Sequence, residues 1–291
     1  MDNFFALIIG VGGDLAATAA DASAVHALLS DPLRGGYPAA NITLLVDEDS
    51  SKEKVLNALD ELIAKTDQAE NATVVVYYSG HGLQFPQEEN PNLFDYYLKT
   101  SGADKTRKEE TMVNGLVFSK KINRIKAARL LILLDCCHAD GLGPKRIDAL
   151  EEMTVQETSS NRGLLEKLTE GEGRVFISAC DDDEESVILP GSKNSLFTEV
   201  CLEALHGKLS PADEFVPVID LMYFVVKEVP KRVLPFHHKQ RPIITEVQNL
   251  SPDYFVCRNG DYKTAEVQLE DFIIDNSAER LLFLQEYDNK L

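Results

Sequence analysis

The chain has 291 residues, of which 44% are hydrophobic and 26% are charged, a balance that permits a sizeable folded core. Its 29 basic and 48 acidic side chains give a net charge of −19, which argues against nucleic-acid binding because phosphate contacts need basic patches. No run of about 18 apolar residues predicts a membrane span, and the N-terminus lacks the basic region of a secretory signal. The five cysteines are an odd number without the spacing of zinc ligands, which favours reduced thiols. We therefore expect a cytoplasmic protein with neither a nucleic-acid nor a membrane partner.

The first 140 residues alternate between short apolar runs and amphipathic stretches, which is typical of βαβ units and a mostly parallel sheet. Ser50 and Glu53 have capping-box spacing ahead of an apolar stripe, which predicts a helix after the second strand. The polar stretch from about 84 to 115 looks like a long irregular insertion, apart from 94–98. We expect strands over 4–11, 42–46, 73–78, 129–134 and 174–179, and further helices over 19–29, 195–205 and 218–229.

Two of the apolar strands end in side chains that can carry out chemistry. One strand runs into His81, and another runs into the adjacent cysteines Cys136 and Cys137. The carboxyl ends of parallel strands lie at the same sheet edge, where open α/β folds build their sites. His81 precedes Cys137 by 56 residues, which leaves room for a crossover between the strands. This arrangement indicates an intracellular thiol enzyme.

Peptide cleavage needs these residue types. A thiolate attacks the carbonyl, an imidazole manages the protons, and fixed N–H groups hold the oxyanion. Gly82 follows the histidine and lets the backbone approach a substrate closely. In an extended segment Cys136 and Cys137 point to opposite faces, so only one thiol faces the cleft easily. His138 is an alternative base, although consecutive residues rarely orient a proton transfer.

The two motifs resemble those of the caspase and metacaspase group of cysteine peptidases. Tyr77–Gly82 (YYSGHG) is similar to the histidine motif of that group, and Leu134–Gly141 (LDCCHADG) is similar to its cysteine motif. In the metacaspase form the nucleophile immediately precedes a histidine, which selects Cys137 with His81 as its base. The implied oxyanion hole consists of the backbone N–H groups of Gly82 and Cys137. The resemblance extends to about residue 244 and includes the sequence QRP at 240–242.

This resemblance implies an α/β fold of three layers, in which helices flank a central, mostly parallel sheet of six strands. It also implies a single peptidase domain over residues 1–250. Within it we expect a large-subunit-like region at 1–140, a linker at 141–173 and a small-subunit-like region at 174–250. Residues 251–291 form a C-terminal extension of unknown role in this interpretation.

The resemblance further implies an acidic specificity pocket and cleavage after Arg or Lys. In metacaspases one acidic residue lies two positions before the nucleophile and another begins the first helix. These positions correspond to Asp135 and Asp21, and Ser79 lines the same pocket. Paired carboxylates suit a guanidinium or ammonium group. An alternative role for Asp21 is to satisfy backbone donors at a helix N-terminus.

Many metacaspases need calcium, held by acidic residues that include a pair just before the helix that precedes the nucleophile strand. The corresponding stretch here, Asn114–Ser119, lacks that pair. The acidic run Asp181–Glu185 is typical of a solvated loop. We therefore expect no metal and no other cofactor, and the sequence does not support calcium dependence.

Caspase-like peptidases are often zymogens, activated by cleavage between their two regions. The segment 139–173 is the natural place for such a cut by a basic-specific enzyme. The implied partners are protein or peptide substrates and an activating protease or regulatory partner. Similarity to bacterial members without extra domains implies a role in stress response or anti-phage defence. The candidate processing sites are Lys145, Arg146, Arg162 and Lys167.

Two other functions fit parts of this pattern. A catalytically silent scaffold of the same fold would signal by binding, but it has no physical need of intact Cys137, His81 and pocket carboxylates. A legumain- or gingipain-like relative would share the fold but have different pocket chemistry. Hydrolysis of peptides ending in Arg, Lys or Asp, compared with Cys137→Ala protein, separates these functions.

Overall fold

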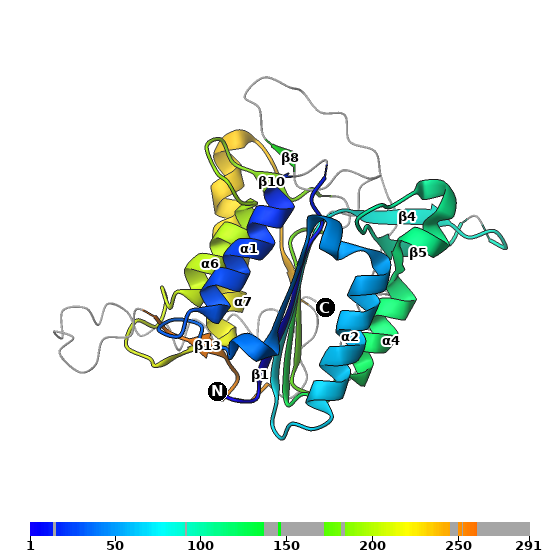
Figure 1. Ribbon diagram of the computed structural model, residues 1–291. Coiled ribbons are helices and arrows are strands. Elements are labelled where there is room, and N and C mark those ends of the chain that lie inside the picture. Colours follow the sequence, from blue (N-terminus) through cyan, green and yellow to red (C-terminus); the bar gives the residue numbers. More distant parts are fainter. Residues whose placement is uncertain are drawn as a thin grey trace.

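A central six-stranded sheet forms the middle of the computed structural model (Figure 1). Its strand order is β12-β9-β7-β3-β1-β2, and all neighbours are parallel except β12 and β9. The predicted α/β fold with a mostly parallel sheet of six strands is confirmed. The strand β12 has only two residues, too few to show a periodicity in the sequence. The strands are β1 (Phe4–Gly10), β2 (Ile42–Val46), β3 (Thr73–Ser79), β7 (Arg129–Asp135), β9 (Arg174–Ser178) and β12 (Ile243–Ile244).

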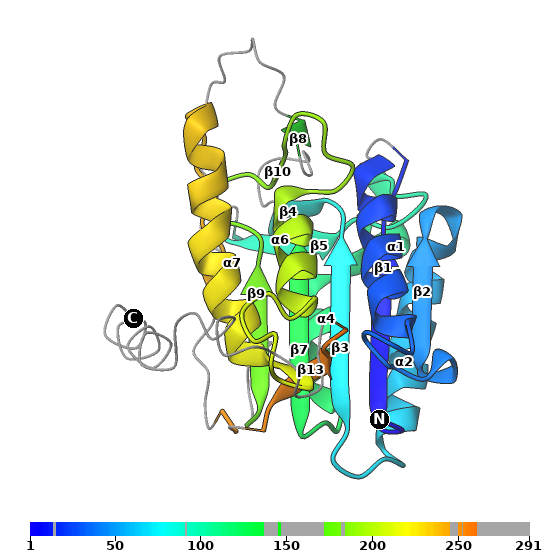
Figure 2. The same ribbon diagram turned by 90° about the vertical axis from the view of Figure 1, so that its left-hand side faces the viewer.

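Helices cover both faces of the sheet, so the domain has three layers (Figures 1 and 2). α1, α6 and α7 lie on one face, and α2 and α4 lie on the other. Successive strand residues alternate between the faces, so Tyr77 packs in the core beneath α1 and α6 while Tyr78 packs beneath α2 and α4. The helices are α1 (Ala16–Ser30), α2 (Lys52–Thr66), α4 (Gly115–Arg124), α6 (Leu196–Leu205) and α7 (Val218–Val233).

Residues 82–114 are more regular than the sequence pattern indicates. β4 (Gly82–Pro86) and β5 (Phe94–Leu98) form an antiparallel hairpin, to which β6 (Val113–Asn114) adds a third strand. The expectation of an irregular insertion here is therefore wrong. The small sheet has partly exposed positions, so its sequence is polar although it is regular. Its buried side chains, which include Leu83 and Tyr97, form a small separate core.

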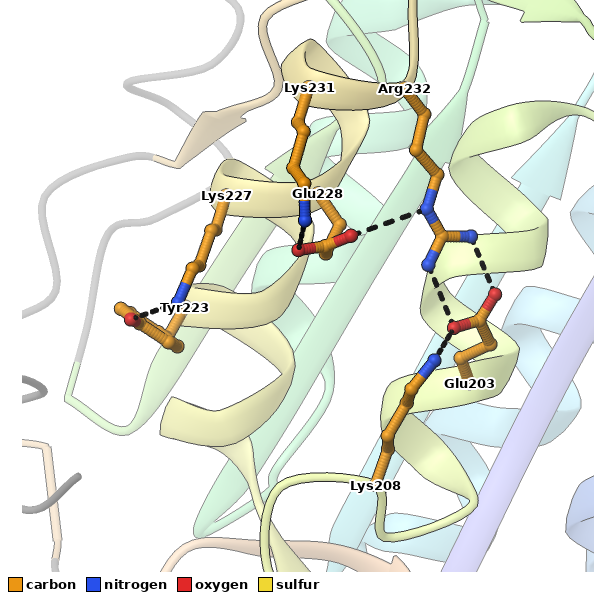
Figure 3. A network of polar contacts seen from close by, with 7 residues as sticks. All are labelled: Glu203, Lys208, Tyr223, Lys227, Glu228, Lys231 and Arg232. Atoms are coloured by element: carbon orange, nitrogen blue, oxygen red, sulfur yellow. Dashed lines mark hydrogen bonds and ion pairs between the residues drawn. The ribbon is translucent and has the colours of Figure 1, made fainter. Parts of the chain in front are cut away.

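A network of charged side chains joins α6 to α7 (Figure 3). Arg232 on α7 donates two hydrogen bonds to the Glu203 carboxylate on α6, at 2.5 and 2.8 Å. The same guanidinium lies 3.4 Å from Glu228, one turn earlier on α7, and Lys208 also contacts Glu203. A bidentate contact between arginine and a carboxylate has a defined geometry. The contact between Arg232 and Glu203 therefore helps to hold α6 against α7, and the first turn of α6 contributes to the candidate site.

Two short strand pairs lie outside the main sheet. β11 (Phe215–Pro217) pairs with β13 (Phe255–Arg258), so residues beyond 250 contribute to the core beneath α6 and α7. β8 (Lys145–Arg146) pairs in parallel with β10 (Val187–Ile188).

None of the described helices is long and apolar enough to cross a membrane. The structure describes residues 1–13, 16–90, 92–136, 145–146, 172–181, 184–244, 250–251 and 253–260, with the backbone alone at 16, 145 and 146.

Candidate functional site

The carboxyl ends of β3 and β7 lie side by side, at the sheet edge where the sequence predicts a site. Their parallel register pairs Ser79 with Asp135. The Val11 N–H donates to the Ser79 carbonyl at 2.9 Å, and the Gly80 N–H donates to the Asp135 carbonyl at 3.2 Å. These bonds align the ends of β1, β3 and β7, so the residues that follow them begin from one edge.

His81 follows this edge by two residues and is buried, with 2% of its surface exposed. Its carbonyl accepts a hydrogen bond from the Lys99 N–H at 2.9 Å. The single proton of the Tyr78 hydroxyl is shared between the His81 carbonyl at 3.0 Å and the Lys99 carbonyl at 2.8 Å. Gly82, the expected oxyanion donor, begins β4 directly after it. The main chain at His81 is therefore held by β3 on one side and by the hairpin of β4 and β5 on the other.

The two adjacent cysteines continue β7. Cys136 is buried in the core beneath α2 and α4, whereas the side chain of Asp135 contacts α6 on the opposite face. Cys137, the predicted nucleophile, lies outside the described residues. In the sequence it follows Asp135 by two positions, as His81 follows Ser79.

The Asp135 carboxylate is fully buried and accepts hydrogen bonds from three hydroxyl groups. Ser186 donates to Oδ1 at 2.8 Å, Thr198 donates to Oδ2 at 2.8 Å, and Ser195 also donates to Oδ2. Ser195 caps α6, and Thr198 belongs to its first turn. The carboxylate therefore lies beside the positive end of the α6 dipole, which favours its charged form.

Asp21 lies on α1, which begins shortly after β1 ends. The Thr18 hydroxyl ties the first turn of this helix to the main chain beyond β1, at 2.6 Å. The buried carboxylate of Asp21 accepts hydrogen bonds from the Ser79 hydroxyl at 3.2 Å, the Asn194 amide at 2.7 Å and the Ser195 N–H at 3.0 Å. The Asp21 side chain therefore accepts hydrogen bonds from residues outside α1, and one of them, Ser195, caps α6.

The structure brings the three expected pocket residues, Asp21, Ser79 and Asp135, together. Ser195 bridges the two carboxylates, because its N–H donates to Asp21 and its hydroxyl donates to Asp135. Among the described residues, neither carboxylate is paired with a lysine or arginine side chain. Two buried carboxylates without a counter-ion have the chemistry to bind a cationic group.

Burial controls the protonation of this pair. Burial and then repulsion from Asp135 raise the pKa of Asp21 to about 8. Burial also raises the pKa of Asp135, while its three hydroxyl donors lower it. Burial and the two nearby carboxylates raise the pKa values of Tyr77 and Cys201 as well, so both of these neighbours are neutral. In the absence of a bound cation, burial and the neighbouring charge therefore favour the protonated form of Asp21.

Gln240 orients one of the hydroxyl groups. This fully buried side chain donates to the Ala179 carbonyl at 3.0 Å and to the Ser186 hydroxyl at 3.4 Å, and it accepts the Val187 N–H at 3.1 Å. Since Ser186 accepts from Gln240, its own proton points to Asp135. Gln240 belongs to the QRP sequence of the family resemblance, but the pattern alone does not indicate this role.

Tyr77 orients a second of these hydroxyl groups, that of Thr198. Its hydroxyl lies 2.5 Å from the Thr198 oxygen, and because Thr198 donates to Asp135, Tyr77 is the donor in this contact. The sequence pattern offers no signal for Ser186 or Asn194. Ser195 was recognisable only as the polar residue at the start of a predicted helix.

The candidate processing sites are described only in part. Lys145 and Arg146 form β8, which pairs with β10 directly after the pocket residue Ser186. The backbone of this basic pair therefore runs beside the strand that leads out of the pocket. Arg162 and Lys167 lie outside the described residues.

Two residues of the acidic run at 181–185 contact an arginine. Glu184 is buried and accepts hydrogen bonds from both the main chain and the guanidinium of Arg241, which also lies 3.5 Å from Asp181. The Asn114 side chain, where an acidic pair would be expected for calcium, caps α4. In the described parts of the chain, no group of three or more His, Cys, Asp or Glu residues is placed to hold a metal ion.

Comparison with known proteins gives a consistent result. Residues 3–253 match the family model of the caspase domain, peptidase family C14. Metacaspase-3 of Arabidopsis thaliana is 25% identical over 232 residues, which cover 73% of this chain and 60% of the relative. Metacaspase-4 of the same plant is 26% identical over 133 residues, which cover 43% of this chain and 30% of the relative. The chain thus spans less than two thirds of the length of either relative.

A crystal structure of a Geobacter sulfurreducens protein has the same fold, with a TM-score of 0.57 and 18% sequence identity. The match covers 87% of this chain and 96% of that one.

Proposed function

Because this chain belongs to the caspase-domain family of cysteine peptidases, we propose that it hydrolyses peptide bonds with Cys137 as the nucleophile and His81 as the general base. The register of β3 and β7, which pairs Ser79 with Asp135, supports this assignment most directly. Each candidate residue follows its member of that pair by two positions in the sequence. Two parallel strands that end in register favour a meeting of the side chains that follow them.

The proposed reaction passes through a thioester. His81 accepts the thiol proton of Cys137, and the thiolate attacks the carbonyl carbon of the scissile bond. The backbone N–H groups of Gly82 and Cys137 stabilise the resulting oxyanion. The C–N bond then breaks as the imidazolium gives its proton to the leaving amine. A water molecule, deprotonated by the same imidazole, hydrolyses the thioester and regenerates the thiol.

We propose that the cleaved bond follows Arg or Lys. No lysine or arginine of the described residues pairs with the buried carboxylates of Asp21 and Asp135, and the Ser79 hydroxyl donates to Asp21. A guanidinium or ammonium group would supply the missing positive charge, so that pairing offsets the cost of burying it. A substrate Asp or Glu would add another buried negative charge and is expected to be rejected.

Hydrolysis of peptides that release a reporter amine on cleavage tests both the catalytic pair and the preference for Arg or Lys. We expect wild type to cleave after Arg or Lys and to leave Asp and Asn peptides intact. Cys137→Ala and His81→Ala are each expected to lower kcat by about 10³-fold or more. Cys136→Ala is the matched control and should keep activity, because this thiol faces the core beneath α2 and α4.

Two outcomes would favour the alternatives. A folded wild-type protein that binds peptides but cleaves none would favour the catalytically silent scaffold. Cleavage after Asn or an acidic residue would favour a legumain- or gingipain-like specificity and would contradict the role proposed for Asp21 and Asp135.

We also propose that the chain is a zymogen processed within 141–173. The pairing of β8 with β10 supports Lys145 or Arg146 as the first site of cleavage, with Arg162 and Lys167 as further candidates. Incubation of purified protein, followed by sequencing of new N-termini, tests self-cleavage. An active enzyme that stays intact throughout would contradict it.

The cellular role is proposed from the resemblance to bacterial members alone. We propose a cytoplasmic protease of stress response or anti-phage defence, controlled by an activating protease or a regulatory partner. Comparison of new protein N-termini between cells with wild type and cells with Cys137→Ala would identify its substrates. Substrates confined to unrelated processes would contradict the defence role.

A further inference from the structure

The donors that hold the pocket carboxylates differ in their access to solvent. Asn194 is only partly buried, and its amide donates to Oδ1 of Asp21 at 2.7 Å. The other described side chains that donate to the two carboxylates are fully buried. Among these donors, Asn194 is therefore the one that solvent contacts. The buried donors are Ser79, Ser186, Ser195 and Thr198.

Asn194 belongs to a surface segment that joins β10 to α6. Pro190, Gly191 and Lys193 of this segment are exposed. Gly191 has a φ of 84°, and a side-chain atom added there would meet nothing within 4 Å. The segment before Asn194 is therefore exposed to solvent, with open space beside Gly191.

Ser195, the next residue, is far more constrained. Its hydroxyl accepts the Thr198 N–H at 3.0 Å, which caps α6, and the same hydroxyl donates to Asp135. Displacement of Ser195 would uncap the helix and remove donors from both carboxylates. Asn194, in contrast, holds Asp21 through one side-chain hydrogen bond. Of the two residues that share Oδ1 of Asp21, only Asn194 can leave at a small cost.

We propose that Asn194 gates the acidic pocket: its amide occupies Asp21 while the pocket is empty, and the cationic side chain of the substrate displaces it. This inference rests on the proposed basic specificity and deepens it by naming the residue that the cation replaces. A charged donor binds a carboxylate more strongly than a neutral amide does, so a cation more than compensates for the broken bond. A neutral side chain offers at best an equal hydrogen bond and gains nothing by entering.

Variants at position 194 test the gate with arginine and lysine peptides. Asn194→Ala removes the competing amide, so we expect KM to fall by about tenfold with kcat unchanged. Asn194→Lys places an ammonium group over Asp21, so we expect KM to rise by about tenfold or more, again with kcat unchanged. Lys193→Ala is the matched control, because it alters an exposed residue of the same segment and should behave as wild type.

The outcomes separate this inference from the proposed function. If wild type prefers Arg and Lys but Asn194→Ala leaves KM unchanged or raises it, the amide does not compete with substrate and the gate is refuted. If wild type shows no preference for basic residues, the proposed specificity itself fails before any variant is compared. Thermal unfolding of each variant shows whether the fold is intact, and the split between KM and kcat excludes a purely structural effect.

Discussion

Ser79 and Asp135 are the last paired residues of β3 and β7, and their side chains connect the sheet edge to two different helices. Ser79 donates to Asp21 on α1, while Asp135 accepts a hydrogen bond from Thr198 on α6. The acidic pocket therefore lies where one end of the sheet meets the N-terminal half of α1 and the first turn of α6. Its two carboxylates come from different layers, so its chemistry depends on how the layers pack.

Asp21→Asn should change how stability depends on pH. The pKa of Asp21 rises from its ordinary 3.8 to about 8 in the fold, so the folded state keeps a proton that the unfolded state releases. The stabilising effect of this proton is complete below pH 3.8 and is lost as the pH rises toward 8. Asparagine resembles the protonated carboxyl group without titrating. The variant should therefore gain stability over wild type across this window, by up to about 1.4 kcal/mol per pH unit.

Thermal unfolding of both proteins at several pH values within that window measures the effect. A stability difference that stays constant with pH would show that Asp21 does not bind the extra proton. Asp213→Asn is a suitable control, because this carboxylate is exposed and its removal should give no such trend.

Gly80→Ala should impair catalysis through the main chain of His81. A Cβ at position 80 would lie 2.5 Å from the Tyr78 hydroxyl, which holds the His81 carbonyl at 3.0 Å. Tyr78 is buried, so relief of the clash must shift the histidine segment. We expect kcat to fall by about 10²-fold, since small misplacements of reacting groups are costly.

The double variant Gly80→Ala with Tyr78→Phe tests this explanation. Loss of the hydroxyl removes the nearest clashing atom, so the double variant should regain part of the lost kcat relative to Gly80→Ala. Strictly additive losses in steady-state assays would contradict a clash between these two positions.

Gln240→Met should destabilise the domain and weaken substrate binding together. The substitution keeps a similar volume but leaves the Val187 N–H and the Ala179 carbonyl without their buried partner. We expect the free energy of unfolding to fall by about 2–4 kcal/mol. KM for arginine peptides should also rise, because Ser186 is no longer oriented toward Asp135. Urea unfolding and steady-state kinetics measure the two effects, and Lys239→Met, an exposed neighbour, is the control.

Arg232→Met should remove the ion pair that joins α6 to α7 without affecting peptide hydrolysis (Figure 3). Because Arg232 and Glu203 are partly exposed, we expect a loss of only about 1 kcal/mol in the free energy of unfolding. Hydrogen bonds from Arg232 and Lys208, partly opposed by burial, lower the pKa of Glu203 from 4.5 to about 2. The contact is thus complete above pH 4.5 and weakens as the pH falls toward 2. Unfolding curves in this acidic range should converge for the two proteins; a gap that persists would contradict the ion pair.

The sequence by itself determined the central strands and the two motifs that follow them. The apolar runs at 73–78 and 129–134 are continuous local signals, and they match β3 and β7 closely. The shared direction of parallel strands then predicted that the residues after both strands lie at one edge. The assignment of Cys137 as the nucleophile stays a prediction, because this residue lies outside the described chain.

Only the tertiary structure decided the register of Ser79 with Asp135 and the donors around the two carboxylates. Asn194 and Asp21 are 173 positions apart, and a hydrogen bond between such distant residues leaves no periodic trace in the sequence. The same holds for Gln240 and Ser186, which are 54 positions apart. Hydrophobic periodicity records which face of an element is buried, whereas the partners of a buried polar group depend on how the layers pack.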